Sequence, residues 1–239
     1  MNALAVTDIG RSRPVNQDVV FSSLEPIGCL PNLFIVADGM GGHKAGDTAS
    51  RFTVDNFVDL IRQSDEKDPV SVINESVTKV NEKLLIKASE SPDYDGMGTT
   101  LVAAVICDGL LRVANVGDSR LYVINDEITQ ITRDHSWVEE MVMRGEINRQ
   151  EARHHEKKNV ITRAIGGEHN VEAEMFSVDL NKDDKILMCS DGLTNMIEDA
   201  DILRIVKKSP NIKEAAKELI EQANNNGGKD NISVIIIEP

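Results

Sequence analysis

The sequence predicts an α+β fold, a four-layer α-β-β-α sandwich of two antiparallel sheets flanked by helix pairs. Two observations carry this prediction. Predicted strands come in clusters and predicted helices come in adjacent pairs, whereas a parallel sheet would show regular strand–helix alternation. In addition, Asp108-Gly109 joins two apolar runs with only two residues, a connection typical of an antiparallel hairpin.

Apolar runs rich in β-branched residues are predicted as strands. They lie at 2–7, 17–22, 33–37, 99–106, 110–116, 120–124, 171–178, 185–189 and 232–237. The three runs between 99 and 124 follow one another through short connections. We therefore expect these three strands to form an antiparallel meander.

Apolar side chains at helical spacing predict two pairs of helices. Residues 45–63 and 70–87 each place such side chains three or four positions apart on one face. They are Val54, Phe57, Val58 and Ile61 in the first segment and Ile73, Val77, Val80 and Leu84 in the second. The second pair is predicted at 202–206 and 212–223, because Pro210 breaks the helical pattern between them.

Residues 132–170 interrupt this pattern. The segment is charged and holds four of the five histidines, which indicates a surface insertion. The chain of 239 residues is long enough to bury a sizeable core without disulfides or metals as staples. We therefore expect one domain over residues 1–239, with an inserted subdomain at about 132–170.

The composition excludes several classes of function. A net charge of −14 argues against nucleic acid and anionic lipid as partners, because both repel an acidic surface. Three cysteines without a CxxC pair indicate neither a disulfide framework nor a cysteine zinc site. The apolar stretch near the start is too short for a signal peptide, and no run is long enough to span a bilayer. We therefore expect a cytoplasmic protein without a membrane segment.

Motifs for a side-chain nucleophile are missing from the sequence. It contains no GxSxG elbow, no Cys-x5-Arg loop, no Walker sequence and no HExxH. Aspartates at the ends of predicted strands are the remaining candidates for chemistry. They are Asp18, Asp38, Asp118, Asp191 and Asp230.

These aspartates would repel one another if they converged on one sheet edge, unless cations neutralised them. Carboxylate oxygens favour hard ions such as Mg²⁺ or Mn²⁺. Gly39, directly after Asp38, leaves a backbone carbonyl as a further oxygen ligand. Spacing alone does not separate such a metal site from five unrelated caps and turns, because an Asp-Gly pair is commonly a turn.

Six blocks of the sequence carry a resemblance to a known family. They are RSRPVNQD, VADGMGG, GMGTTL, ANVGDSR, CSDGL and GGKDNISV, in this order. Together they resemble the bacterial branch of the type 2C, metal-dependent protein phosphatases, the PPM family. The segment TRDHSWVEEMVMRGEI…TRAIG also resembles the flap subdomain of that branch. We call residues 132–170 the flap from here on.

The resemblance implies hydrolysis of phosphoserine and phosphothreonine on proteins by a centre of two Mn²⁺ or Mg²⁺ ions. Carried over position by position, Asp38 bridges both ions and the carbonyl of Gly39 binds the second. Asp191 and Asp230 hold the first. Asp118, together with Asp191, matches a weaker third-metal site.

The resemblance also implies that Arg13 grips the phosphate and that Asp18 orders water at the ions. The chain departs from many eukaryotic members at two positions, with Gln17 in place of a glutamate and Met40 in place of a histidine. His43 is then a candidate general acid, with a solvated loop histidine or water as the alternatives. Two flap histidines, His154 and His155, are expected to be exposed and are assigned no ligand role.

We expect a monomer, and the resemblance implies that it acts in signalling and opposes a bacterial Ser/Thr kinase. Two other classes remain as alternatives. A non-catalytic regulator of the same fold is expected to lack one of the aspartates, and all five positions are acidic here. A metal-dependent nuclease is disfavoured by the net negative charge and the lack of a basic patch.

Overall fold

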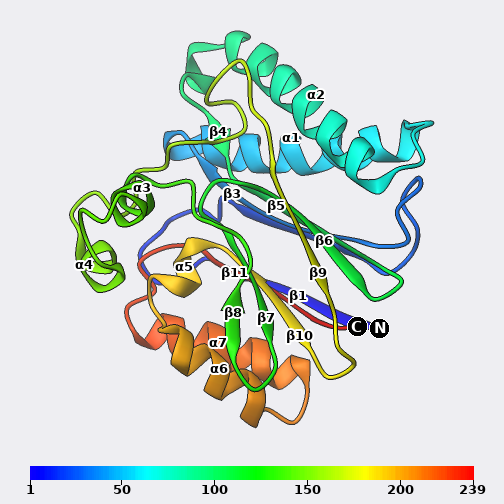
Figure 1. The fold of residues 1–239 in the computed structure, drawn as a ribbon. Coiled ribbons are helices and arrows are strands. Elements are labelled where there is room, and N and C mark those ends of the chain that lie inside the picture. Colours follow the sequence, from blue (N-terminus) through cyan, green and yellow to red (C-terminus); the bar gives the residue numbers. More distant parts are fainter.

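Two antiparallel sheets lie face to face in the computed structural model, which describes residues 1–239 except the side chains of residues 42–44 (Figure 1). One sheet has the strand order β1-β11-β10-β7-β8, and the other has β2-β3-β5-β6-β9 with β4 paired to β3. The first consists of β1 (Asn2–Asp8), β7 (Arg120–Ile124), β8 (Ile128–Gln130), β10 (Lys185–Cys189) and β11 (Ile232–Glu238). The second consists of β2 (Asp18–Ser23), β3 (Leu33–Met40), β4 (Gly98–Thr99), β5 (Leu101–Cys107), β6 (Leu110–Val116) and β9 (Glu174–Asp179).

A pair of helices covers the outer face of each sheet (Figure 1). α1 (Gly42–Gln63) and α2 (Pro69–Ser89) pack on the sheet that contains β3, and α6 (Asp199–Lys208) and α7 (Ile212–Asn225) pack on the sheet that contains β11. This arrangement confirms the predicted α-β-β-α sandwich. Within the described residues, no helix combines the length and the apolar character needed to cross a membrane.

Aliphatic side chains form three core layers, one between the sheets and one under each helix pair. β5 contributes to two of them. Leu101 and Ala103 join the layer under α1 and α2, while Val102 and Ala104 point to the layer between the sheets. A strand that is buried on both faces requires a continuous apolar run, which is what the sequence has here.

Side-chain caps fix the starts of two of the helices, α2 and α7. Asp68 accepts a hydrogen bond from the backbone N–H of Ser71 at 2.8 Å at the start of α2. Asn211 accepts one from the N–H of Glu214 at 3.0 Å at the start of α7. The predicted break at Pro210 is confirmed, since it separates α6 from α7.

The predicted meander is wrong in its last strand. β5 and β6 form the expected hairpin, but β7, predicted as residues 120–124, lies in the other sheet between β10 and β8. Between β6 and β7 the chain crosses from one sheet to the other at Gly117, whose φ is 106°. β7 is apolar on both faces, with Leu121 between the sheets and Tyr122 under α6 and α7. Its hydrophobic pattern therefore does not select one sheet over the other.

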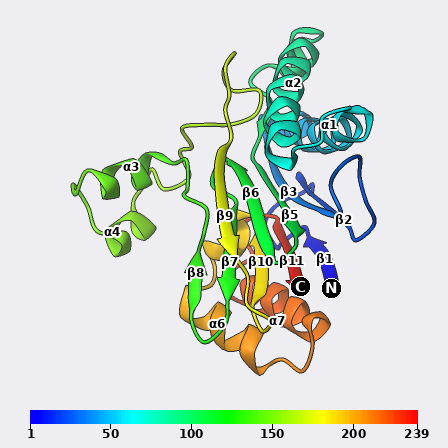
Figure 2. The same ribbon diagram turned by 45° about the vertical axis from the view of Figure 1, so that its right-hand side comes forward.

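The flap lies beside the two sheets and outside both of them (Figure 2). It contains α3 (Trp137–Met143) and α4 (Arg149–His154), two helices of about two turns each. Two further short helical turns lie elsewhere, η1 (Pro92–Tyr94) and α5 (Asp191–Thr194). The bridge between Ser136 and Ile161 closes the base of the flap.

We expect Gly117→Ala to lower the free energy of unfolding more than Gly109→Ala. Their φ values are 106° and 75°, so either alanine costs about 1–2 kcal/mol through its left-handed backbone. A Cβ at Gly117 would also lie 2.6 Å from Cγ2 of Thr100, whereas nothing lies within 4 Å of one at Gly109. That overpacking costs about 1–3 kcal/mol more. Urea denaturation of both variants measures the difference, and equal losses would contradict the clash.

Candidate metal centre

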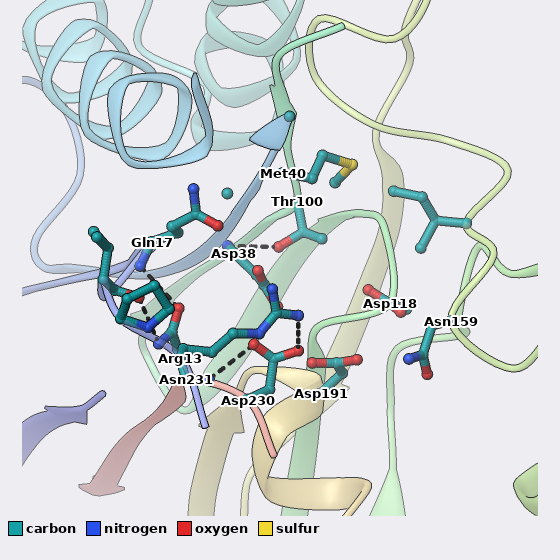
Figure 3. Close-up of a pocket in the computed structure, with 15 residues that line it drawn as sticks. Arg13, Gln17, Asp38, Met40, Thr100, Asp118, Asn159, Asp191, Asp230 and Asn231 are labelled. Atoms are coloured by element: carbon teal, nitrogen blue, oxygen red, sulfur yellow. Dashed lines mark hydrogen bonds and ion pairs between the residues drawn. The ribbon is translucent and has the colours of Figure 1, made fainter. Parts of the chain in front are cut away.

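A pocket of about 330 Å³ lies at one edge of the two sheets, and four aspartates line it (Figure 3). Asp38 belongs to β3, Asp118 follows β6, Asp191 is the first residue of α5, and Asp230 precedes β11. The structure therefore brings together four of the five aspartates that the sequence singled out. Gly39, the predicted carbonyl ligand, lines the same pocket.

Asp18, the fifth aspartate, is buried and is not among the residues that line the pocket. In the pairing of β2 with β3 it stands directly opposite Asp38. Burial raises the pKa of Asp18 to about 7. Burial, and then the charge of Asp18, raise the pKa of Asp38 well above its usual value. Two acids in this register repel each other when both are ionised, so the pair favours a bound proton or a nearby cation.

The carboxyl groups of Asp118 and Asp191 also resist ionisation. Burial, followed by the charge of Asp191, raises the pKa of Asp118 well above its usual value. Burial, followed by the charge of Asp230, raises the pKa of Asp191 to about 6. Asp191 Oδ2 accepts a hydrogen bond from Asn195 at 2.8 Å, while its buried Oδ1 has no hydrogen-bond partner within the described part of the chain. A buried carboxylate oxygen without a donor is suited to bind a cation.

Arg13 is the one cation among the described residues that line the pocket. Its Nη2 lies 2.8 Å from Asp230 Oδ2, and this hydrogen bond raises the pKa of Arg13. The side chain is 48% exposed, so the ion pair is screened by water and contributes little to stability. An exposed guanidinium at the mouth of an acidic pocket is well placed to bind an anion that enters it.

Close packing requires a glycine after Asp38 and after Asp191, at Gly39 and Gly192. A Cβ on Gly39 would collide with the carbonyl oxygen of Gly46 in α1, and a Cβ on Gly192 would collide with the carbonyl oxygen of Asn231. Backbone therefore approaches backbone directly beside both Asp38 and Asp191. These glycines hold the two carboxylates close to neighbouring elements, which a turn alone would not do.

The pocket's donor set fits hydrated divalent cations. All of its charged acceptors are carboxylate oxygens, which suit hard ions. Among the described residues, no three or more His, Cys, Asp or Glu side chains form a ready-made ligand set around one ion. Mg²⁺ and similar ions usually bind one or two carboxylates and keep several waters. Carboxylates that do not all gather around one point therefore agree with the chemistry of these ions.

Sequence reasoning missed two residues that hold the pocket together. Asn231 donates from its side-chain amide to the carbonyls of Ile9 and Val15, and its Oδ1 accepts from the N–H of Gln17 at 2.9 Å. It thereby fixes the loop that carries Arg13. Its signal in the sequence is its position directly after Asp230, inside the block GGKDNISV.

Thr100 is the other residue of this kind. The backbone N–H of Asp38 donates to Thr100 Oγ1 at 2.9 Å, and the hydroxyls of Thr100 and Ser119 lie 2.8 Å apart. Thr100 therefore connects the strand of Asp38 to the residue that follows Asp118. The block GMGTTL contains it, but nothing in the spacing assigns it a partner.

The remaining candidates fall into three groups. Gln17 and Met40 line the pocket. The side chain of His43 lies outside the described residues, so the proposed general acid stays a prediction. His154 and His155 belong to the flap and do not line this pocket. His154 is exposed as predicted, but His155 is only partly exposed, because its ring centre lies 5.3 Å from that of Trp137.

Comparisons with known proteins agree along the whole chain. A family model described as protein phosphatase 2C matches residues 11–233. The serine/threonine phosphatase stp of Listeria innocua is 40% identical over 245 residues, covering 100% of this chain and 96% of that protein. The structure of the serine/threonine phosphatase Stp1 from Staphylococcus aureus has a TM-score of 0.92 at 35% identity, over 99% of this chain and 94% of that one.

A third similar protein was solved with metal. The catalytic domain of the serine/threonine protein phosphatase PstP, in complex with 2 manganese ions, has a TM-score of 0.86 at 34% identity. The match covers 98% of this chain and 96% of that one. The likeness extends to a protein that binds the kind of ion for which the pocket's oxygen donors are suited.

The metal-free protein is expected to lose stability as the pH rises from about 4 to about 7. Asp18 and Asp191 have raised pKa values in the fold, about 7 and about 6, so the folded chain holds protons that the unfolded chain has released. Their stabilisation is present below the unfolded pKa of about 3.9 and is lost through the folded pKa values. A loss of about 1.4 kcal/mol lowers the Tm of a chain of this length by roughly 3–6 °C.

Thermal unfolding in EDTA across this pH range is the measurement. Asp18→Asn removes one of the titrating groups and is expected to flatten the profile between pH 5 and 7.5. A Tm that rises over this interval in the unmodified protein would contradict the prediction.

Proposed function

The chain belongs to the protein phosphatase 2C family, and we propose that it hydrolyses phosphoserine and phosphothreonine on proteins at the pocket of the four aspartates. The single observation that carries the proposal is the combination of four carboxylates with one exposed arginine around one pocket. The carboxylates suit divalent cations, and the arginine suits the phosphate that those cations would help to neutralise.

Asp38, the carbonyl of Gly39, Asp191 and Asp230 would hold two Mn²⁺ or Mg²⁺ ions, with Asp38 shared between them. Asp118 and Asp191 would hold a weaker third ion. When bound, a pair of such ions supplies a deprotonated water for attack on phosphorus and screens the charge of the phosphate. The metal-containing relative supports the presence of two ions. The raised pKa values of Asp191 and Asp118 also support it, because nearby cations would offset the cost of ionising these groups.

The chain's own residues would position the substrate. Arg13 can offer two parallel N–H donors to phosphate oxygens, which a lysine cannot do. Asn231 fixes the loop that carries Arg13, so the guanidinium stays at the mouth of the pocket. Asp18, buried and paired across the strands with Asp38, would order water at the ions through its Oδ1, which has no hydrogen-bond partner among the described residues. No protein nucleophile is required in this scheme.

The proposed cellular role is to oppose a bacterial Ser/Thr kinase, as a monomer in the cytoplasm. The flap, proposed as an inserted subdomain, brings Asn159 and Ile161 to the pocket wall. It is therefore the segment that we propose contacts the polypeptide around the phosphorylated residue. Loops at the rim of a rigid site commonly carry such selectivity.

Phosphate release from a phosphothreonine peptide is expected to require Mn²⁺ or Mg²⁺ and to stop after chelation. Asp230→Asn is expected to reduce the rate close to background, because it removes a direct ligand charge. Asp95→Asn is the control, since Asp95 carries the same carboxyl group but is exposed in a loop and does not line the pocket. Release of phosphate measured with malachite green decides the result. Full turnover without divalent metal would contradict the metal-dependent mechanism, and peptide binding without turnover would favour a non-catalytic regulator.

Arg13→Ala is expected to lower kcat/KM by roughly ten- to a hundredfold, because a charge-assisted hydrogen bond is worth about 1.5–3 kcal/mol. Arg11 is the control in the same loop, since it is exposed and does not line the pocket. Arg11→Ala is therefore expected to leave kcat/KM nearly unchanged. Steady-state kinetics on one phosphopeptide compare the two variants, and equal losses would refute the role assigned to Arg13.

A further inference from the structure

The flap rests on the helical turn that presents Asp191. Arg153 donates from Nη2 to the carbonyl oxygen of Ile197 at 3.1 Å, and Lys158 donates from Nζ to Asn195 Oδ1 at 2.9 Å. Both acceptors lie within one or two turns of Asp191, and the backbone N–H of Asn195 bonds to the carbonyl of Asp191 at 2.7 Å. The flap is thus hydrogen-bonded to the element that carries a proposed metal ligand.

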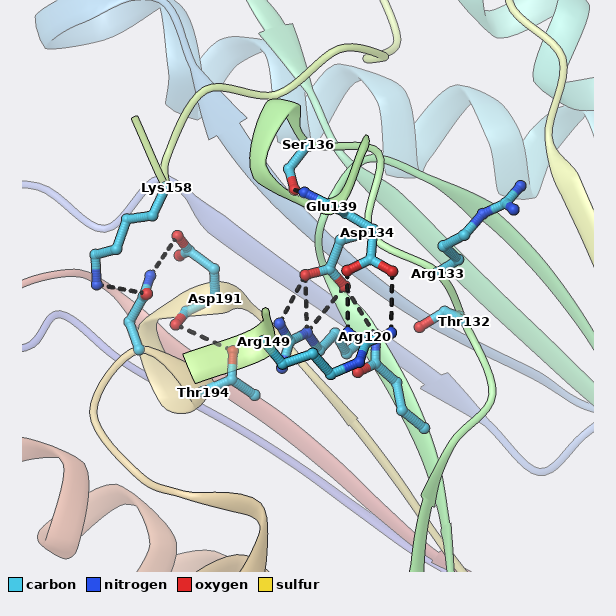
Figure 4. Close-up of polar contacts among 12 residues, drawn as sticks. Arg120, Thr132, Arg133, Asp134, Ser136, Glu139, Arg149, Lys158, Asp191 and Thr194 are labelled. Carbon is cyan, nitrogen blue, oxygen red and sulfur yellow. Dashed lines mark hydrogen bonds and ion pairs between the residues drawn. The ribbon is translucent and has the colours of Figure 1, made fainter. Parts of the chain in front are cut away.

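Lys158, Asn195 and Asp191 form a chain of hydrogen bonds with a fixed direction (Figure 4). The ammonium of Lys158 can only donate, so it selects the carbonyl end of the Asn195 amide. The NH₂ end of that amide then faces Asp191 Oδ2 at 2.8 Å and donates to it. This leaves Asp191 Oδ1, which is buried and without a partner among the described residues, as the oxygen free to bind a cation.

Without the ammonium of Lys158, the Asn195 carbonyl loses the donor that bonds to it, and the hydrogen bond to Asp191 alone holds the orientation of the amide. A flipped amide would place Asn195 Oδ1 against Asp191 Oδ2, and two acceptors repel each other. The carboxylate would then lose the hydrogen bond that sets its rotation. Residues that hydrogen-bond to a metal ligand commonly fix its orientation, and so determine which of its oxygens faces the metal.

The backbone around Lys158 is itself fixed at the base of the flap. The N–H of Lys158 bonds to the carbonyl of His155 at 3.2 Å, and the N–H of Trp137 bonds to the carbonyl of Val160 at 2.8 Å. The neighbouring Lys157 points elsewhere, with its ammonium 4.7 Å from the centre of the Trp137 ring. Two adjacent lysines therefore serve different contacts, and one supplies a control for the other.

We propose that Lys158 is a positioning residue for the metal centre, which fixes Asp191 through Asn195 and so couples the docking of the flap to the binding of cations. This inference rests on the proposed metal centre. The coupling is reciprocal by thermodynamic necessity: if the docked flap strengthens cation binding, then bound cations hold the flap in place by the same factor.

Titration calorimetry of the full chain with Mn²⁺ tests the first half of the coupling. Lys158→Met keeps the length of the side chain but removes the donor, and we expect it to weaken binding at the site that uses Asp191 about tenfold. Lys158→Arg retains a donor-only cation and is expected to restore most of the affinity. Lys157→Met is expected to bind Mn²⁺ like the unmodified protein. Equal affinities of Lys158→Met and Lys157→Met would overturn the inference.

A double-mutant cycle tests whether Lys158 acts through the amide. If it does, combining Lys158→Met with Asn195→Ala is expected to weaken Mn²⁺ binding no more than Asn195→Ala alone. If the two substitutions instead reduce the affinity by independent factors that multiply, Lys158 does not act through Asn195, and the inference is overturned. Failure of the unmodified protein to bind Mn²⁺ at all would instead contradict the proposed function, so the two failures are distinguishable.

Hydrogen exchange tests the second half without any measurement of activity. Mn²⁺ is expected to slow amide exchange in residues 137–160 of the unmodified protein and of Lys157→Met. In Lys158→Met this metal-dependent protection is expected to disappear. Flap protection by Mn²⁺ that persists in Lys158→Met would overturn the coupling.

Discussion

Repulsion among buried and half-buried carboxylates is the constraint on which the rest of this structure depends. Asp18 stands directly across the β2–β3 pairing from Asp38, and the charge of Asp191 raises the pKa of Asp118. The fold keeps them there because each lies at or beside an end of a strand or short helix anchored in aliphatic core. Replacing such acids by neutral residues would relieve the repulsion and remove the site, a conflict between stability and activity that is typical of active sites.

The sequence was sufficient to predict the layers and to single out the four aspartates that line the pocket, because strand patterns and the residues that end a strand are local features. Apolar runs of strand length, paired helical patterns and Asp-Gly steps after a strand each leave a signal within ten residues or so. The assignment of β7 to a sheet depends on no such signal. Leu121 and Tyr122 are both buried, on opposite faces, so the apolar pattern of β7 is compatible with pairing in either sheet. Only the crossing at Gly117 decides between them.

Contacts between distant polar side chains were beyond prediction for a related reason. Asn231 bonds to the backbone of Gln17 across 214 positions, and Lys158 bonds to Asn195 across 37. An asparagine or lysine in a loop satisfies its hydrogen bonds with water equally well, so composition and spacing give it no preferred partner. The burial of Asp18 behind the pocket belongs here too, since it follows from the register of two strands and not from the motif that contains it.

The turn that presents Asp191 shows why the flap matters to the pocket. α5 has four residues, too few to be stable alone, and its first turn lacks a side-chain cap. Ser190 stands at the capping position, but its hydroxyl donates to Asp18 Oδ2 at 2.7 Å and accepts the N–H of Ser233. With its cap committed to the acid behind the pocket, the turn depends on contacts from outside. The flap supplies one through Lys158, and the end of α7 supplies another through Asn226, which donates to the carbonyl of Met196 at 2.7 Å. The orientation of Asp191, a proposed metal ligand, therefore depends on tertiary contacts from the flap and from the end of α7. A change in the flap would alter the pocket through α5, a four-residue helix that has no side-chain cap of its own.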